Sequence, residues 1–194
     1  MTNQTTIQTP LAAKEPVELA GTRLSEMPLC GKITLRGNSD NKAFVAAIKK
    51  ATGLALPIEA NTFNQKGSSM LSWTGPNEWM LHCEIDACLT MVDKLRTALA
   101  DQHAAIVDVS DYYTMVELSG PLAKKVIANG SPFDTHHTQF TTGQCTQTRF
   151  GHAGILMNQM DDNPTYHIQI RWSYADYLFG YMHDALRNHA AEAS

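Results

Sequence analysis

The chain has 194 residues and a formal net charge of −4, with 43% hydrophobic and 18% charged residues. This composition is that of a soluble globular protein that is long enough to bury a substantial core. The small negative charge gives no reason to expect nucleic acid or an anionic membrane as a partner, and no apolar run is long enough to span a bilayer.

Residues 1–28 contain three prolines and show no hydrophobic periodicity. They predict an extended arm that is disordered alone or lies along another surface, followed by a single domain over 29–194. The first nine residues lack the basic start and apolar stretch of a secretory signal, so we expect the cytoplasm as location. The four cysteines form no Cys-x-x-Cys pair and are most simply small buried apolar groups in a reducing compartment.

Hydrophobic periodicity predicts a first unit over about 32–111. Its central feature is an apolar hairpin at 71–81 that reverses at Gly75-Pro76-Asn77 and carries one tryptophan on each arm. In chain order we expect a strand at 32–37, a helix through 44–51, a loop at 56–67, the hairpin, a helix from 88 to about 101, and a strand at 105–110 with apolar residues on both faces, typical of a covered central strand.

The same order of elements then starts again and predicts a second unit over about 113–190. It comprises a strand at 115–120, a helix from Pro121 to Gly130, a hairpin at 144–158 that turns at Gly151, an additional strand at 166–172, and a closing helix that begins at Ser173. Glycines end both first strands (Gly37, Gly120) and stand at both hairpin turns (Gly75, Gly151). We therefore expect an α+β fold made of tandem βαββαβ-like units that form one compact body.

Polar residues at the end of the 105–110 strand are one candidate for chemistry. Asp108, Ser110 and Asp111 could bind an amine or accept a proton there. The same spacing is typical of a turn held by side-chain to backbone hydrogen bonds, and no partner base is identifiable. The pattern favours the turn.

Two further groups resemble metal or proton-transfer sites. Asp134, His136 and His137 lie in a predicted loop, where no third ligand is evident, so they favour a surface loop or an interface. His82 and Cys83, with Cys88, lack the paired close spacings of a structural zinc site. No nucleophile motif or glycine-rich phosphate loop is present, and we predict no catalytic residue and no metal in this chain.

Motifs along nearly the whole chain resemble the gamma subunits of heterotetrameric sarcosine oxidases. Two positions depart from the family pattern, Trp172 in place of a second arginine and Thr135 in place of an apolar residue. The motifs that carry the resemblance are Thr9-Pro10-Leu11, Leu35-Arg36-Gly37, Trp-x-Gly-Pro-Asn-Glu-Trp at 73–79, Val107-Asp108-Val109-Ser110-Asp111, Leu118-Ser119-Gly120-Pro121, Pro132-Phe133-Asp134, Phe140 with Gly143, Gln147-Thr148, and Arg171-x-Ser-Tyr174-Ala-Asp-Tyr-Leu178.

The resemblance implies a fold like that of the folate-binding module of glycine-cleavage aminomethyltransferases. It implies a non-catalytic subunit that partners alpha, beta and delta subunits in an enzyme that oxidises sarcosine to glycine, with formation of hydrogen peroxide and methylene-tetrahydrofolate. FAD, covalent FMN, NAD and tetrahydrofolate would then belong to the partner subunits, with no cofactor in this chain.

An alternative is a stand-alone folate-binding aminomethyltransferase-like protein. Against it, Thr142-Gly143-Gln144-Cys145 lacks the Lys and Tyr of the corresponding run in the stand-alone relatives. For the assembly subunit we expect Trp73 in the core, and we expect the interface near Trp79, Pro76, His136 and Tyr177.

Overall fold

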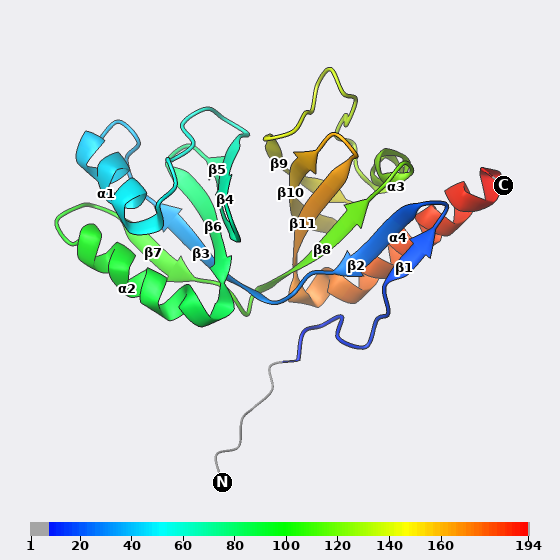
Figure 1. Ribbon diagram of the computed structural model, residues 1–194, viewed down its shortest axis with the longest axis horizontal. Helices are drawn as coiled ribbons and strands as arrows, with labels where there is room; N and C mark the ends of the chain where they lie inside the picture. The colour runs from blue at the N-terminus through cyan, green and yellow to red at the C-terminus, as the bar shows by residue number, and fades with distance from the viewer. Residues whose placement is uncertain (1–7, 194) are drawn as a thin grey trace, which may run out of the picture.

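The computed structural model describes residues 8–193, which form two β-sheets with helices on their outer faces. The uncovered faces of the two sheets are turned toward each other (Figure 1). Within the described residues, no helix is both long and apolar enough to cross a membrane. The predicted α+β fold with two related units is confirmed.

The first unit is a five-stranded sheet in the order β4-β5-β6-β3-β7, covered on its outer face by α1 and α2. Its apolar core combines one face of the strands with the inner stripe of both helices, as alternating and helical periodicity require. The elements are β3 (Cys30–Arg36), α1 (Lys42–Thr52), β4 (Phe63–Lys66), β5 (Ser69–Gly75), β6 (Glu78–Glu84), a 3₁₀ turn (Ile85–Ala87), α2 (Cys88–Ala98) and β7 (Ala105–Asp108).

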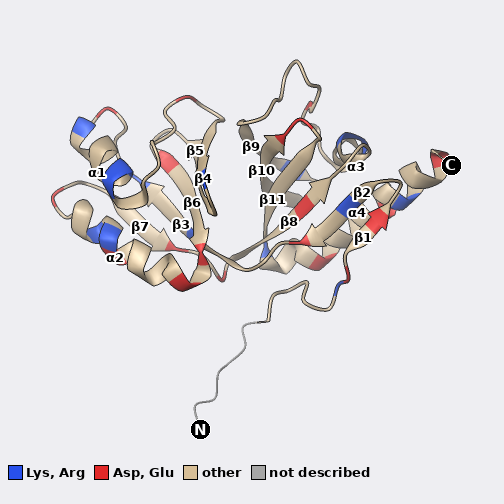
Figure 2. Cartoon of the chain, in the orientation of Figure 1, with Lys and Arg blue, Asp and Glu red and all other residues tan. Residues whose placement is uncertain are grey.

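The second unit is a six-stranded sheet in the order β1-β2-β8-β11-β10-β9, with α3 and α4 on its outer face. Figure 2 shows Lys and Arg on the helices that cover the first unit and acidic residues on both units. The elements are β1 (Val17–Leu19), β2 (Thr22–Glu26), β8 (Tyr113–Ser119), α3 (Ala123–Gly130), β9 (Cys145–Phe150), β10 (Ala153–Asp161), β11 (Thr165–Arg171) and α4 (Trp172–Glu192).

The predicted strand at 166–172 is present as β11, but it is not an addition to the second unit, because both units contain three strands between their helices. The segment 56–67, expected to be a loop, holds β4, whose Phe63-Asn64-Gln65-Lys66 has too little apolar alternation to be recognised. Matching the sheet orders pairs β4 with β9, β5 with β10, β6 with β11 and β3 with β8. The first hairpin therefore corresponds to β10–β11, and the predicted match to the Gly151 turn is also wrong.

A bulge in each unit supports this correspondence. The pairing of β5 with β6 shifts register between Trp73 and Gly75, and that of β10 with β11 shifts between Gln159 and Asp161. Trp79 and Tyr166 then occupy matching positions, opposite Leu35 and Leu118 respectively. Both aromatic side chains are fully buried. Each unit thus places one large aromatic ring at the same point of its core.

This position corrects the prediction for the two tryptophans. Trp79, expected near the interface, is 1% exposed, and its Nε1–H donates to the carbonyl oxygen of Pro57 at 2.7 Å. Trp73, expected in the core, is only partly buried. Trp73 pairs directly with Trp79, so both lie on the helix-facing side, but Trp73 is on β5, beside the edge strand β4, and packs against the first core from there.

Part of the predicted N-terminal arm is instead a hairpin of the second sheet. Strand β2 pairs antiparallel with β8 and places Leu24 opposite Leu118, and Leu11 and Leu24 are buried in the second core. In the first unit the matching position beside β3 is filled by β7, which follows the last helix of that unit. The second unit thus takes its fifth strand from the start of the chain. Residues 1–7 of the predicted arm lie outside the described residues.

The strand β7 is also not the covered strand that its sequence suggests. It lies at the edge of the first sheet, and Val107 is 50% exposed. An apolar run of this length occurs both in central strands and, as here, in an edge strand, so composition alone does not distinguish the two positions.

Replacement of Leu24 by alanine is expected to lower the free energy of unfolding by about 3 kcal/mol, because the side chain is fully buried between β8 and the second core. Arg23→Ala on the same strand removes an exposed side chain and should change it by less than about 0.5 kcal/mol. Chemical denaturation monitored by circular dichroism measures both. Equal, small effects would show that the hairpin is a detachable arm.

Candidate functional site

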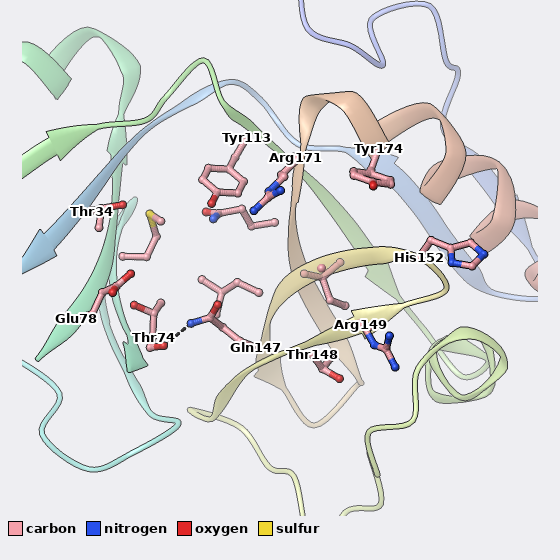
Figure 3. Close-up of a pocket in the computed structure, with 15 residues that line it drawn as sticks. Thr34, Thr74, Glu78, Tyr113, Gln147, Thr148, Arg149, His152, Arg171 and Tyr174 are labelled. Atoms are coloured by element: carbon pink, nitrogen blue, oxygen red, sulfur yellow. Dashed lines mark hydrogen bonds between the residues drawn. The ribbon is translucent and has the colours of Figure 1, made fainter. Parts of the chain in front are cut away.

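A cleft of about 480 Å³ lies between the two sheets (Figure 3). Both units contribute to its walls, and most of the lining side chains are polar. The lining residues are Thr34, Thr74, Glu78, Met80, Tyr113, Gln147, Thr148, Arg149, His152, Gly154, Ile155, Leu156, Gln169, Arg171 and Tyr174.

Strand alternation explains why polar groups reach this cleft. In β3 and β6 the residues Leu35 and Leu81 face the helices, so their neighbours Thr34 and Met80 face the opposite sheet. In β11 the residues Ile168 and Ile170 face the second core, so Gln169 faces the cleft. The apolar face of each sheet packs against its helices and forms a core, and the polar faces of the two sheets line the cleft between them.

The acidic side chain of the cleft is paired with an arginine, whereas the two arginines that line the cleft are not paired with a carboxylate of the described residues. Glu78 forms an ion pair with Arg36, with Oε2 and Nη2 2.8 Å apart. Arg171 lies over the ring of Tyr112, with its Cζ 5.5 Å from the ring centroid. Arg149 lines the cleft without an ion pair to any described residue. The cleft therefore carries an excess of positive charge at its second-unit wall.

Hydrogen bonds between the two sheets close the cleft on one side. The Nδ2 of Asn158 donates to Ser72 Oγ at 2.8 Å, and Gln147 donates through its amide nitrogen to the carbonyl oxygen of Thr74. His82 Nε2 lies 2.7 Å from Gln169 Oε1. All three contacts join the first unit to the second, so they fix the width of the cleft.

Among the residues that join the two sheets, His82 has a strongly shifted pKa. Burial lowers its pKa to about 4, and the positive charges of Lys32 and His167 act in the same direction, although the contact with Gln169 opposes them. The imidazole is therefore neutral at neutral pH. Because Gln169 Oε1 is an acceptor, Nε2 carries the proton and Nδ1 is left as an acceptor without a partner among the described residues.

The turn that follows β7 holds the first chemical candidate. Ser110 donates to Asp108 Oδ1 through its backbone nitrogen at 3.0 Å and through its hydroxyl at 2.5 Å. Burial alone raises the pKa of Asp108, but these hydrogen bonds outweigh it and hold the pKa below its ordinary value. These contacts support the interpretation of this segment as a turn, in which the Asp108 carboxylate accepts hydrogen bonds from Ser110.

The predicted His and Cys groups do not assemble into a metal site. Among residues 8–193 there is no group of three or more His, Cys, Asp or Glu side chains that could hold an ion. His136 is exposed, and its backbone nitrogen donates to Asp134 Oδ1 within the loop. Cys83 and Cys88 are buried in the first core, and burial raises the pKa of Cys83 to about 12.

The four residues predicted for the interface are not gathered at one place. Pro76 is exposed at the hairpin turn and lines a second hollow beside Gly37 and Phe44. Tyr177 is 41% exposed on α4, with its ring 6.3 Å from that of His152. Sequence reasoning missed the cleft itself. The alternation His167-Gln169-Arg171 was visible, but which face the opposite sheet would cover was not.

Comparisons with known proteins agree with one another. The model of the sarcosine oxidase gamma subunit family matches residues 36–188. Sarcosine oxidase subunit gamma from Corynebacterium sp. (strain U-96) is 27% identical over 185 residues, which cover 93% of this chain and 88% of the relative.

Two solved structures share the fold. A chain of heterotetrameric sarcosine oxidase from Corynebacterium sp. U-96, in complex with pyrrole 2-carboxylate, matches with a TM-score of 0.85 and 23% identity over 95% of this chain and 96% of that chain. The glycine cleavage system aminomethyltransferase T from Bartonella henselae matches with a TM-score of 0.60 and 12% identity over 82% of this chain and 44% of that chain. The predicted likeness to the aminomethyltransferase fold is thereby confirmed.

Proposed function

The chain belongs to the sarcosine oxidase gamma subunit family, and we propose that it is the non-catalytic assembly subunit of a heterotetramer that oxidatively demethylates sarcosine to glycine. The match of the family model to residues 36–188, which include most of both units, carries this proposal. The enzyme would form hydrogen peroxide and, with tetrahydrofolate, methylene-tetrahydrofolate, which links it to one-carbon metabolism.

The chemistry of the cleft supports a role in assembly rather than catalysis. Its acidic side chain, Glu78, is held by Arg36 at 2.8 Å. Its histidine, His152, lies beside the ring of Tyr177, and the described neighbours offer no nucleophile paired with a base. Such a wall can bind and position a group, which suits a subunit that holds others in place.

In this proposal the alpha, beta and delta subunits are the partners and carry FAD, FMN, NAD and tetrahydrofolate. The four cysteines are free thiols, as expected for a protein of the cytoplasm, where we place the complex. Co-expression of the four subunits, with a tag on one partner, tests the assignment. The gamma chain should co-purify in a constant ratio with a flavin-containing, sarcosine-oxidising complex, and its absence from that complex would contradict the proposal.

The fold shared with aminomethyltransferase T suggests a second candidate function, that of a stand-alone folate-binding protein. Calorimetric titration of the isolated chain with tetrahydrofolate distinguishes the two. Our proposal expects no saturable heat at high micromolar folate, whereas saturable binding near one equivalent would favour the alternative.

Tyr177 is the exposed aromatic residue that we propose for the subunit interface. Replacement by alanine is expected to weaken incorporation into the complex by roughly fivefold or more, because a tyrosine in a protein interface often contributes over 1 kcal/mol. Leu89→Ala is the matched control, since Leu89 is 73% exposed on α2, which covers the first unit. Quantitative co-purification measures both. Equal incorporation of both variants would remove Tyr177 from the interface, and His136→Ala and Pro76→Ala test the other two exposed positions in the same way.

A further inference from the structure

A row of residues across the second sheet places two arginines on either side of a glycine. Arg149 on β9 pairs with Gly154 on β10, and Gly154 directly precedes the Ile155–Ile170 pair, so it faces Arg171 on β11. All three line the cleft. With neighbouring strands about 4.8 Å apart, the Cα atoms of the two arginines are roughly 10 Å apart. From this arrangement we infer that the row is a binding site for a carboxylate presented by an acidic segment of a partner subunit.

The floor of this site is open. A Cβ built on Gly154 meets no atom within 4 Å, and Gly154 is exposed. Gly154 is also absent from the glycines with positive φ, so neither a turn nor close packing requires a glycine here. The missing side chain leaves a gap between the two arginine stems, and the backbone of the strand forms its base.

Neither guanidinium group is paired with a carboxylate of residues 8–193, and Glu78, the acidic residue of the cleft, is paired with Arg36. Among the described residues the side chain of Arg149 makes no ion pair or hydrogen bond, and Arg171 contacts only the ring face of Tyr112. By contrast, Arg36 is paired with Glu78 at 2.8 Å and Arg187 with Asp184 at 3.2 Å. Figure 3 shows Arg171 reaching into the cleft and Arg149 nearer its His152 end. Guanidinium groups form strong paired hydrogen bonds with carboxylates.

The first turn of α4 adds to the positive potential at the same place. The helix begins at Trp172, directly after Arg171, and no side chain caps its N-terminus. No acidic residue lies in its first turn. The Trp172 N–H donates to the Tyr112 carbonyl oxygen at 3.1 Å, but the helix dipole still favours a negative group at this end of the 21-residue helix.

The rim of the cleft favours a protein segment as the source of that carboxylate. Tyr174 lines the cleft, Tyr112 lies under the guanidinium of Arg171, and the ring of Tyr177 lies beside that of His152. Their exposed fractions are 37%, 47% and 41% respectively. Exposed tyrosines beside arginine are the composition of energetically important protein interfaces. The site rests on the proposed function, since the partner is another subunit of the oxidase.

A competition experiment in the assembled enzyme tests the site. Cells co-express the partner subunits with two gamma chains, one wild type and one variant, that carry different tags. The complex is isolated through a partner subunit, and the ratio of the tags is measured. We expect Arg149→Met/Arg171→Met and Gly154→Val, which fills the floor, to be incorporated at less than one tenth of the wild-type level. The control Arg187→Met should be incorporated equally with wild type.

If the site is real, the double arginine variant fails because the positive charge is lost, and Gly154→Val fails because the added side chain blocks the site. Thermal unfolding of each isolated chain establishes whether it folds. If the double arginine variant does not fold, Gly154→Val alone decides the test. Incorporation of a folded Gly154→Val or double variant within twofold of wild type would overturn the site while leaving the proposed function intact. Failure of the wild-type chain itself to enter the complex would overturn both.

Discussion

Trp79→Ala is expected to lower the free energy of unfolding by roughly 4 kcal/mol, within the range of about 3–5 kcal/mol for removal of a buried aromatic side chain. The indole is 1% exposed and packs against Phe44, with ring centroids 5.8 Å apart. Truncation leaves a cavity beneath α1 and leaves the carbonyl of Pro57 without its donor. Guanidinium denaturation measures the loss, and the thermal midpoint should fall by about 10 °C.

Two controls separate the contributions. Trp79→Phe keeps most of the packing but removes the hydrogen bond to Pro57, so it should cost only about 1–2 kcal/mol. Trp73→Ala should cost clearly less than Trp79→Ala, because Trp73 is only partly buried at the edge of the same core. The opposite ranking of the two tryptophans would support the arrangement expected from the sequence and would contradict the burial described for the two side chains.

The two tryptophans show where sequence reasoning stops. Strand alternation and the Gly-Pro-Asn turn suffice to predict the hairpin. They do not predict how deeply each tryptophan is buried. Trp73 pairs directly with Trp79, so both face the helices, but Trp73 lies on β5, next to the edge strand β4, whereas Trp79 lies on β6, nearer the middle of the sheet. The error therefore concerns position across the sheet rather than the type of element, because local alternation does not show which strand lies nearer the edge.

The duplication was predictable from the order of elements, whereas the origin of the fifth strand was not. Residues 17–26 contain Val17, Leu19 and Leu24 in too short a pattern to indicate strands. Their partner, β8, lies far along the chain, and the hydrophobic contact of Leu24 with the second core overrides the weak local preference. Long-range pairing of this kind leaves little trace in local sequence.

The cleft escaped prediction for a related reason. Its residues come from β3, β5, β6, β8, β9, β10, β11, the turn before β10, and α4, and most of them are ordinary polar residues of half-buried strands. Only the packing of the two polar faces against each other brings Thr34 of the first unit and Arg171 of the second into one cleft. The same packing buries His82, which alternation alone would place on a solvated face.

The buried His82 predicts a loss of stability at mildly acidic pH. Its pKa is about 4 in the folded chain and 6.5 in the unfolded one, so the unfolded state gains a proton first as pH falls. The stability due to the neutral imidazole is complete above pH 6.5, decreases by about 1.4 kcal/mol per pH unit below it, and is lost by about pH 4. The total is about 3 kcal/mol. Burial also lowers the pKa of His167, which adds to the loss in the same direction.

His82→Gln should remove this part of the pH dependence, because glutamine can still donate to Gln169 and does not titrate. The difference in unfolding free energy between variant and wild type, from urea denaturation at pH 7 and pH 4.5, isolates His82 because the remaining titrating groups are common to both chains. It should change by roughly 2–3 kcal/mol in favour of the variant. Ser72→Ala, which removes the neighbouring hydrogen bond to Asn158, is the matched control and should lower stability equally at both pH values. A His82→Gln difference that is constant with pH would mean that His82 is solvated and that the two sheets do not close over it.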